Sequence, residues 1–150
     1  MIRSLALLAG LLTAVTPAIA GDLIKKSSPH SVATTLDRLE AAIGKAGATV
    51  FARIDHAGGA KKVGMKLNDA QLLIFGNPKL GTPAMQAGIT AGLDLPLRVL
   101  AYTGADGTTH LVYHAPATMA KTHGIPTDAP VVAKMTGALD KLTGVAVAAE

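Results

Sequence analysis

The stretch from Leu72 to Gln86, LLIFGNPKLGTPAMQ, constrains this chain more than any other segment. An apolar run of strand length ends abruptly at Gly76-Asn77-Pro78. The loop that follows carries Lys79, and Thr82-Pro83 has the chemistry of a helix start, with Thr82 as the N-cap. Turn residues placed so densely after a buried strand indicate a backbone shape on which the fold or a site depends.

The N-terminus has the pattern of a secretory signal peptide. Arg3 supplies a positive charge, Ser4 to Val15 is an apolar run too short to span a bilayer comfortably, and Ala18-Ile19-Ala20 places small residues at a cleavage site. We therefore expect a signal peptide at residues 1–20 and a single domain at residues 21–150. The protein would be secreted, in the periplasm, with no membrane segment after cleavage. The alternative is an uncleaved membrane anchor.

Composition excludes several classes of protein. The chain has 14 basic and 10 acidic residues and a net charge of +4, without a basic cluster, which favours solubility and argues against a nucleic-acid partner. Cysteine is absent, so disulfides, iron–sulfur clusters, zinc–thiolate sites and thiol catalysis are excluded.

Hydrophobic periodicity predicts an α+β fold. The order is strand, helix, four mostly antiparallel strands and helix, with the helices on one face of the sheet. We expect a flexible turn at Ala57 to Ala60, and the end of the last helix at Gly144. The expected strands are 22–28, 49–56, 71–76, 97–102 and 108–114, and the expected helices are 32–43, 82–86, 117–123 and 129–143.

The third and fourth predicted strands carry apolar residues on both faces, as at Leu72-Leu73-Ile74-Phe75. Two helices cover only one face of such a sheet, so the other face needs a further cover. A second copy of the same chain is the commonest cover for a surface of this kind. We therefore expect a homodimer.

Four segments carry a resemblance to a known family. They are Phe51 to Ala57 (FARIDHA), Leu72 to Met85 (LLIFGNPKLGTPAM), Gly92 to Leu100 (GLDLPLRVL) and Tyr113 to Pro116 (YHAP). On these segments the chain resembles the bacterial family called domain of unknown function 302. The resemblance implies a compact, often dimeric α+β fold with strand–helix–four strands–helix topology, and almost nothing about activity. Some relatives carry a Cys after the Leu-Pro of the fourth strand, where this chain has Leu97, so a thiol role does not apply here.

Asp55 and His56 stand at a predicted strand end, where an acid and an imidazole can transfer protons. Neighbouring strand residues point to opposite faces, so these two do not form a hydrogen-bonded pair, and Asp55 can instead pair with Arg53. Two interpretations stay open. Both residues can be structural, or Asp55 or His56 can be the base of a cofactor-independent lyase or isomerase with Lys79 as the electrophilic group.

The loop from Gly76 to Thr82 has two glycines at the spacing of a phosphate loop. Thr82 stands where that motif needs Lys, which argues against a nucleotide site. A helix that starts at Thr82-Pro83, with Lys79 nearby, can still attract an anion. The alternative is a rigid turn that shapes a dimer contact or a groove.

Histidines offer a further class, a haem- or metal-binding accessory protein. His110 and His114 share a strand face, but four residues along a strand span about 13 Å, so another histidine would have to join one of them. We predict no metal site and no cofactor.

Our favoured hypothesis is a homodimeric domain that binds a small, apolar or anionic ligand, or a partner protein, in a groove near the central loop. Whether the protein is an enzyme stays open. Polar residues at strand ends around an apolar sheet motivate the hypothesis, and those expected to contribute are Arg53, Asp55, His56, Asn77, Lys79 and Thr82.

Overall fold

The computed structural model describes residues 23–149, so the expected signal peptide at residues 1–20 lies outside the described residues. The strands are β1 (Leu23–Ser28), β2 (Thr49–Asp55), β3 (Ala70–Gly76), β4 (Leu97–Thr103) and β5 (Thr109–His114). The helices are α1 (Val32–Lys45), α2 (His56–Lys62), α3 (Pro78–Ala87), the 3₁₀ helix η1 (Ile89–Leu93), α4 (Pro116–Thr122) and α5 (Pro130–Val147).

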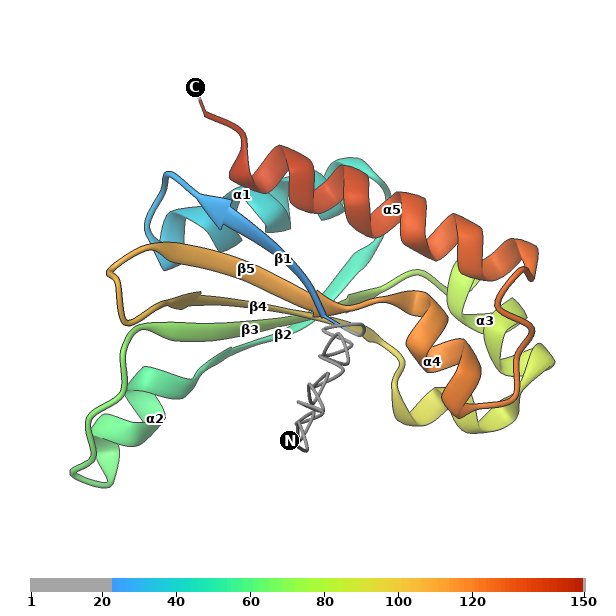
Figure 1. The fold of residues 1–150 in the computed structure, drawn as a ribbon, viewed down its shortest axis with the longest axis horizontal. Coiled ribbons are helices and arrows are strands. Elements are labelled where there is room, and N and C mark those ends of the chain that lie inside the picture. The colour runs from blue at the N-terminus through green and yellow to red at the C-terminus, as the bar shows by residue number, and fades with distance from the viewer. Residues whose placement is uncertain (1–22, 150) are drawn as a thin grey trace, which may run out of the picture.

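The strands form one five-stranded sheet in the order β1-β5-β4-β3-β2, and all neighbours are antiparallel. Helices α1 and α5 lie over one face of this sheet (Figure 1). The fold is therefore α+β with the two long helices on one face, which confirms the prediction from periodicity.

The main core lies between the sheet and these two helices. Leu36, Leu39 and Ile43 recur on one side of α1, and they are fully buried against Leu73 of β3 and Leu139 of α5. This is the apolar stripe that helical spacing in the sequence indicated. It fixes which side of every strand faces the helices.

We call the opposite side of the sheet the open face. Side chains alternate between the two faces along a strand. The residues directly before and after the buried Leu73, Val99 and Leu111 in sequence therefore belong to the open face. Its centre is apolar and only partly buried, at Leu72, Ile74, Leu100 and Val112. By register the open face comprises Leu23, Lys25, Ser27, Ala52, Ile54, Ala70, Leu72, Ile74, Arg98, Leu100, Tyr102, His110, Val112 and His114.

A second core cluster lies at one end of the sheet. There α3, η1 and α4 pack together with the first half of α5, and Ala84, Ala91, Met119 and Met135 are buried between them. Helix α2 lies at the opposite end of the sheet (Figure 1).

Helix α2 stands where the sequence predicted a flexible turn at Ala57 to Ala60, so that prediction was wrong. Asp55 caps the helix, because its Oδ1 accepts a hydrogen bond from the Gly58 N–H at 2.8 Å. Gly64, at φ +73°, follows the helix in the left-handed conformation. A side chain at Gly58 would collide with the Asp55 carboxylate, so this glycine makes room for the cap.

Helix α3 starts earlier than predicted. Asn77 is its N-cap, since Asn77 Oδ1 accepts from the Lys79 N–H at 2.9 Å, and Pro78 takes the first helical position. Thr82 therefore lies inside the helix, and its prediction as the N-cap was wrong. Helix α5 also differs, because it continues through Gly144 to Val147.

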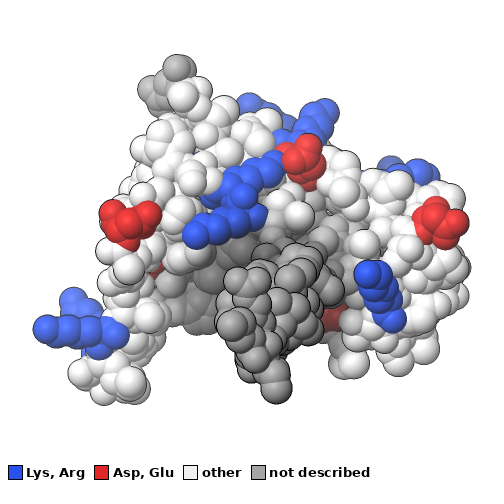
Figure 2. Space-filling model, in the orientation of Figure 1, with Lys and Arg blue, Asp and Glu red and all other residues white. Residues whose placement is uncertain are grey.

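On the face of the molecule that Figure 2 shows, basic and acidic groups lie in several separate places. Lys26 and Arg98 are two of the basic residues that form ion pairs with acidic partners. Lys26 Nζ lies 2.7 Å from Asp140 Oδ1, and Arg98 Nη2 lies 2.8 Å from Asp94 Oδ1.

Candidate functional site

The structure divides the six residues expected at one groove between two ends of the sheet. In the antiparallel β2–β3 pair, Thr49 faces Gly76 at one end and Asp55 faces Gln71 at the other. The ends of such a pair lie about 20 Å apart at the usual rise per residue. Asp55 and His56 are therefore remote from Asn77 within one chain.

Asp55 and His56 form no joint site in the described part of the chain. The Asp55 carboxylate is engaged as the cap of α2, and His56 is an exposed residue of the first turn of that helix. A wide surface depression at this end is lined by Asp55 but not by His56, together with charged and apolar residues such as Lys61, Asp69, Met65 and Leu67. Nothing in this arrangement holds a substrate between an acid and a base.

Arg53 is a structural link between β2 and α1. Its guanidinium lies 2.6 Å from Asp37 Oδ1 and 3.3 Å from Glu40 Oε1, and its Nε donates to Gln71 Oε1 at 2.9 Å. It also donates to the carbonyl of Ala33. Its partner is therefore α1, not Asp55 as the sequence suggested.

Asn77 and Thr82 do line a common space, which we call the central-loop cavity. It has a volume of about 340 Å³ and lies between the start of α3, the ends of β2 and β3, and α5. Lys79 is exposed outside this lining. The lining is mostly apolar: Ala46, Ala48, Phe51, Phe75, Gly76, Asn77, Pro78, Leu80, Gly81, Thr82, Met85, Leu95, Pro96, Leu97, Met135, Ala138 and Leu142.

A β-bulge brings an aromatic ring to the edge of the central-loop cavity. The β2–β3 register shifts between Val50 and Ala52, so Phe51 has no partner residue in the β2–β3 register. Phe51 is 59% exposed, so its ring is open to solvent. Gly76 lies beneath this ring, because a Cβ there would sit 3.6 Å from Phe51 Cε2.

The central-loop cavity has few polar atoms, and some of them already make hydrogen bonds within the protein. Asn77 Nδ2 donates to the carbonyl of Gly47 at 3.1 Å, while its Oδ1 caps α3. Thr82 lies in the middle of α3, so the helix start that was expected to attract an anion there does not exist. The central-loop cavity is therefore suited to apolar groups.

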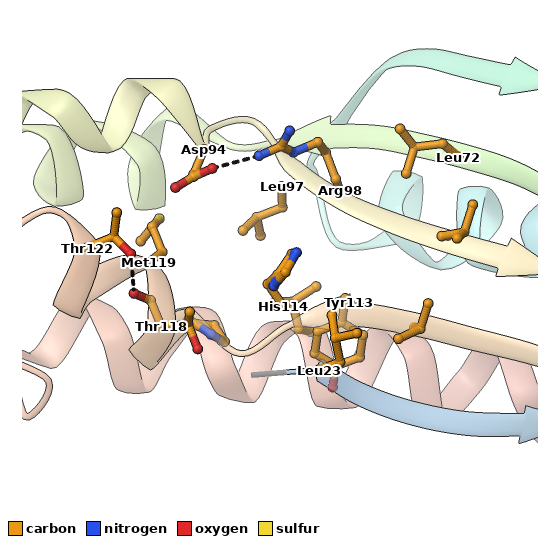
Figure 3. A pocket seen from close by; sticks show the side chains of 14 residues that line it. Leu23, Leu72, Asp94, Leu97, Arg98, Tyr113, His114, Thr118, Met119 and Thr122 are labelled. Carbon is orange, nitrogen blue, oxygen red and sulfur yellow. Dashed lines mark hydrogen bonds and ion pairs between the residues drawn. The ribbon is translucent and has the colours of Figure 1, made fainter. Parts of the chain in front are cut away.

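A second cavity opens where β4 and β5 diverge. Their ladder runs from Thr103↔Thr109 to Leu100↔Val112 and stops there, although β4 begins at Leu97 and β5 ends at His114. Figure 3 shows the space between the separating strands, with α4 beside it. We call this space, of about 500 Å³, the fork cavity; it is lined by Leu23, Leu72, Asp94, Leu97, Arg98, Leu100, Val112, Tyr113, His114, Pro116, Thr118, Met119, Thr122 and Leu139.

A chain of polar contacts borders the fork cavity. Asp94 Oδ2 lies 2.7 Å from His123 Nε2, and His123 Nδ1 lies 3.0 Å from Thr90 Oγ1. The other Asp94 oxygen accepts from Arg98 at 2.8 Å. The hydrogen bond with His123, followed by the charge of Arg98, lowers the pKa of Asp94 below its ordinary value. The His123 side chain is only 5% exposed, so the chain joins η1 to α4 as a structural clamp.

Sequence reasoning missed this chain of contacts. Asp94 and Arg98 lie in one of the segments that carry the family resemblance, which was the available signal. Their partner His123 is distant in sequence, and only the packing of η1 against α4 brings it near. The histidines give little further support for a metal site. Among the described residues, no group of three or more His, Asp or Glu could hold a metal ion.

Comparison with known proteins identifies the family. The sequence profile described as "Domain of unknown function DUF302" matches residues 24–142. The chain is 42% identical over 121 residues to the fluoride-specific ion channels FluC 1 of Brucella suis and FluC 1 of Brucella abortus, matching 79% of this chain and 48% and 45% of those proteins. The chain thus spans about half the length of the curated relatives it matches.

A solved structure shares the fold. The crystal structure of an uncharacterized conserved DUF302 protein from Bacillus stearothermophilus matches with a TM-score of 0.75 at 17% identity, covering 83% of this chain and 97% of that one. In the described part of this chain, no helix has the length and apolar character needed to cross a membrane. The family profile covers most of the domain, and the chain belongs to the DUF302 family.

Proposed function

We propose that this protein binds a small apolar ligand in the central-loop cavity. The observation that carries the proposal is a cavity of about 340 Å³, walled by leucine, methionine and phenylalanine side chains. Ligand pockets in proteins have this range of volume and this apolar lining with a few polar groups.

The exposed Phe51 ring supports the proposal. A bulge holds this ring at the edge of the cavity, where an apolar ligand would cover it and remove it from water. Asn77 and Thr82 supply the polar groups that would orient such a ligand. The competing enzyme function, with Asp55 or His56 as base, has less support because the Asp55 carboxylate caps a helix.

We also propose export and dimerisation. Residues 1–20 have the pattern of a signal peptide cleaved before Gly21, so the purified protein would begin there. The open face carries an apolar centre at Leu72, Leu100 and Val112, which a second copy of this chain would cover.

Fluoride is a further ligand to consider, because the curated relatives are named as fluoride-specific channels. An apolar lining cannot replace the hydration of a small anion. We therefore expect sodium fluoride neither to bind in the central-loop cavity nor to displace an apolar ligand from it.

The test uses the neutral fluorescent probe N-phenyl-1-naphthylamine. We expect saturable fluorescence enhancement with the wild type. Ala138→Leu adds three carbon atoms to the α5 wall of the cavity and should weaken probe binding about tenfold. Ala133→Leu, on an exposed side of the same helix, is the matched control and should bind as the wild type does. Equal binding by all three proteins would contradict the proposal.

A further inference from the structure

We propose that the fork cavity is a second ligand site, which binds an amphipathic carboxylate. The carboxylate would lie between Arg98 and His114, and the apolar chain would enter the space between β4 and β5. This site is separate from the central-loop cavity, so the inference does not depend on the function proposed above.

The fork arises from the register of the sheet. Arg98 pairs with Ile74 on β3, and His114 pairs with Leu23 on β1, so each strand keeps its outer neighbour. Between the two strands the described pairing ends at Leu100↔Val112. The sheet is therefore split at this end, and the space between β4 and β5 reaches the helix side of the sheet, where Met119 and Leu139 line it.

Arg98 is held in position at the mouth of the split. Its Nη2 donates to Asp94 Oδ1, and the other oxygen of that carboxylate contacts the buried His123. A guanidinium has five N–H donors, and the hydrogen bond to Asp94 is the only one that the Arg98 side chain makes with a described residue. Its side chain is 45% exposed, so its remaining donors can reach a ligand carboxylate.

His114 stands on the other side of the split. Figure 3 shows it reaching from the β5 side into the space between the strands, while Arg98 lies on the β4 side. The imidazole makes no hydrogen bond to another described residue and is exposed. Two nitrogen-bearing side chains with unused donors thus flank one cavity.

The charge of the surrounding surface favours an anion over a cation. The strand residues of the open face include Lys25 and Arg98 together with His110 and His114, and none of the described strand residues on that face is Asp or Glu. The carboxylate of Asp94 at the cavity edge has both oxygens engaged, with Arg98 and with His123. A ligand cation would therefore have no free carboxylate among these residues to pair with.

The interior of the fork is apolar. Leu97, Leu100, Val112, Met119 and Leu139 line it, and the last two also contribute to the buried cores. A volume of about 500 Å³ exceeds what a carboxylate alone would fill. An alkyl or aromatic body attached to the anionic group would bury this surface and supply the hydrophobic part of the affinity.

The test measures decanoate binding to the full-length protein by isothermal titration calorimetry. We expect decanoate to bind Ala138→Leu, in which the central-loop cavity is filled, at least about tenfold more tightly than decanol or decyltrimethylammonium. Arg98→Gln should weaken decanoate binding by about tenfold to a hundredfold, and Arg98→Lys, which keeps the charge, by less. Lys121→Gln, on an exposed position of α4 outside the cavity lining, is the charge-matched control and should leave binding unchanged.

Two further measurements locate the ligand. Thr122→Phe would block the fork from α4 and should abolish decanoate binding, while circular dichroism shows that each variant is folded. Ala138→Leu, which fills the other cavity, should bind decanoate as the wild type does. The proposal is overturned if the wild type does not bind decanoate, if decanol binds Ala138→Leu as tightly as decanoate does, or if folded Arg98→Gln binds as tightly as Lys121→Gln.

Discussion

Asp94 connects three parts of the molecule through one carboxylate. It lies directly after η1, contacts His123 at the end of α4, and accepts a hydrogen bond from Arg98 of β4. Replacing Asp94 by Asn removes the charge from both contacts and leaves His123 buried beside a weaker acceptor. We expect a loss of about 1–2 kcal/mol in the free energy of unfolding at neutral pH.

The loss should depend on pH in a defined direction. Because the pKa of Asp94 is lowered from 3.8, its ionised form stabilises the fold above that pH, and the contribution disappears as the pH falls through the lowered pKa. Urea unfolding of wild type and Asp94→Asn at about pH 7, 5 and 3 should show a difference that persists to pH 5 and shrinks at pH 3. Asp128→Asn, at an exposed site, is the control. A difference that grows toward acid pH would contradict the assignment.

The contacts of single residues could be predicted from the sequence in some cases and not in others. Asn77 and Thr82 line one cavity, because they are close in sequence and follow one strand end. The sequence suggested that Arg53 pairs with Asp55. In the structure Arg53 instead forms ion pairs with two carboxylates of α1. Contacts of this kind depend on how a helix docks on the sheet, which strand alternation alone cannot specify.

Among the elements, α3 depends most on its first residue. Asn77 caps the helix through Oδ1 and holds the α1–β2 connection through Nδ2, which donates to Gly47. Asn77→Ala removes both contacts and should cost about 1–2 kcal/mol. Asn77→Asp keeps the cap and loses only the donated hydrogen bond, so it should cost less.

Chemical denaturation of these two variants measures the difference directly. Thr82→Ala serves as the control, because Thr82 lies within α3 and caps nothing. If Thr82→Ala is more destabilising than Asn77→Ala, the start of α3 has been placed wrongly.

The junction between α3 and η1 depends on close packing at Gly88. A Cβ there would lie 2.7 Å from the carbonyl oxygen of His123 and 3.0 Å from Ile125 Cγ1. A backbone atom cannot swing aside as a side chain does, so Gly88→Ala should destabilise the protein by about 1–3 kcal/mol.

Thermal unfolding of Gly88→Ala against Gly59→Ala measures this contribution. At Gly59, in α2, a Cβ would meet no atom within 4 Å, and an Ala there should be neutral or slightly stabilising. Equal melting temperatures for the two variants would show that the η1–α4 contact is looser than the structure indicates.

The helices also show where sequence patterns fail. Helix α1 was predicted nearly in full, because its stripe of apolar residues is regular. Helix α2 was missed because Gly58 and Gly59 favour a turn by intrinsic propensity, whereas the cap from Asp55 and the left-handed Gly64 stabilise a helix. For α3, two Pro-containing start signals compete in sequence, and only the first coincides with the end of β3.

At the scale of the whole molecule, the fold class and the order of the strands and the two long helices followed from periodicity. The antiparallel sheet, its five strands and the position of both long helices agree with the prediction. The fork between β4 and β5 was not predictable, because an interrupted ladder leaves the period of apolar residues unchanged. The separation of Asp55 from Asn77 is equally a property of the assembled sheet.

The prediction of a dimer rests on the open face of the sheet. Leu100 lies on its central strand between Leu72 and Val112, so a charge there would be placed in the middle of the proposed dimer contact. Light scattering after size exclusion should give a dimer for the wild type and a monomer for Leu100→Glu. Val63→Glu, at an exposed position after α2, is the control and should remain dimeric. A monomeric wild type would contradict the prediction.

Methionine methyl NMR tests the central claim of an apolar ligand site most directly, because the chain places methionines at both cavities. Met85 and Met135 line the central-loop cavity, Met119 lines the fork cavity, and Met65 is exposed near α2. With labelled methionine methyls and N-phenyl-1-naphthylamine as the titrant, we predict saturable shifts for Met85 and Met135 and none for Met65 or Met119. Unchanged Met85 and Met135 signals, or shifts confined to Met65 or Met119, would contradict the account.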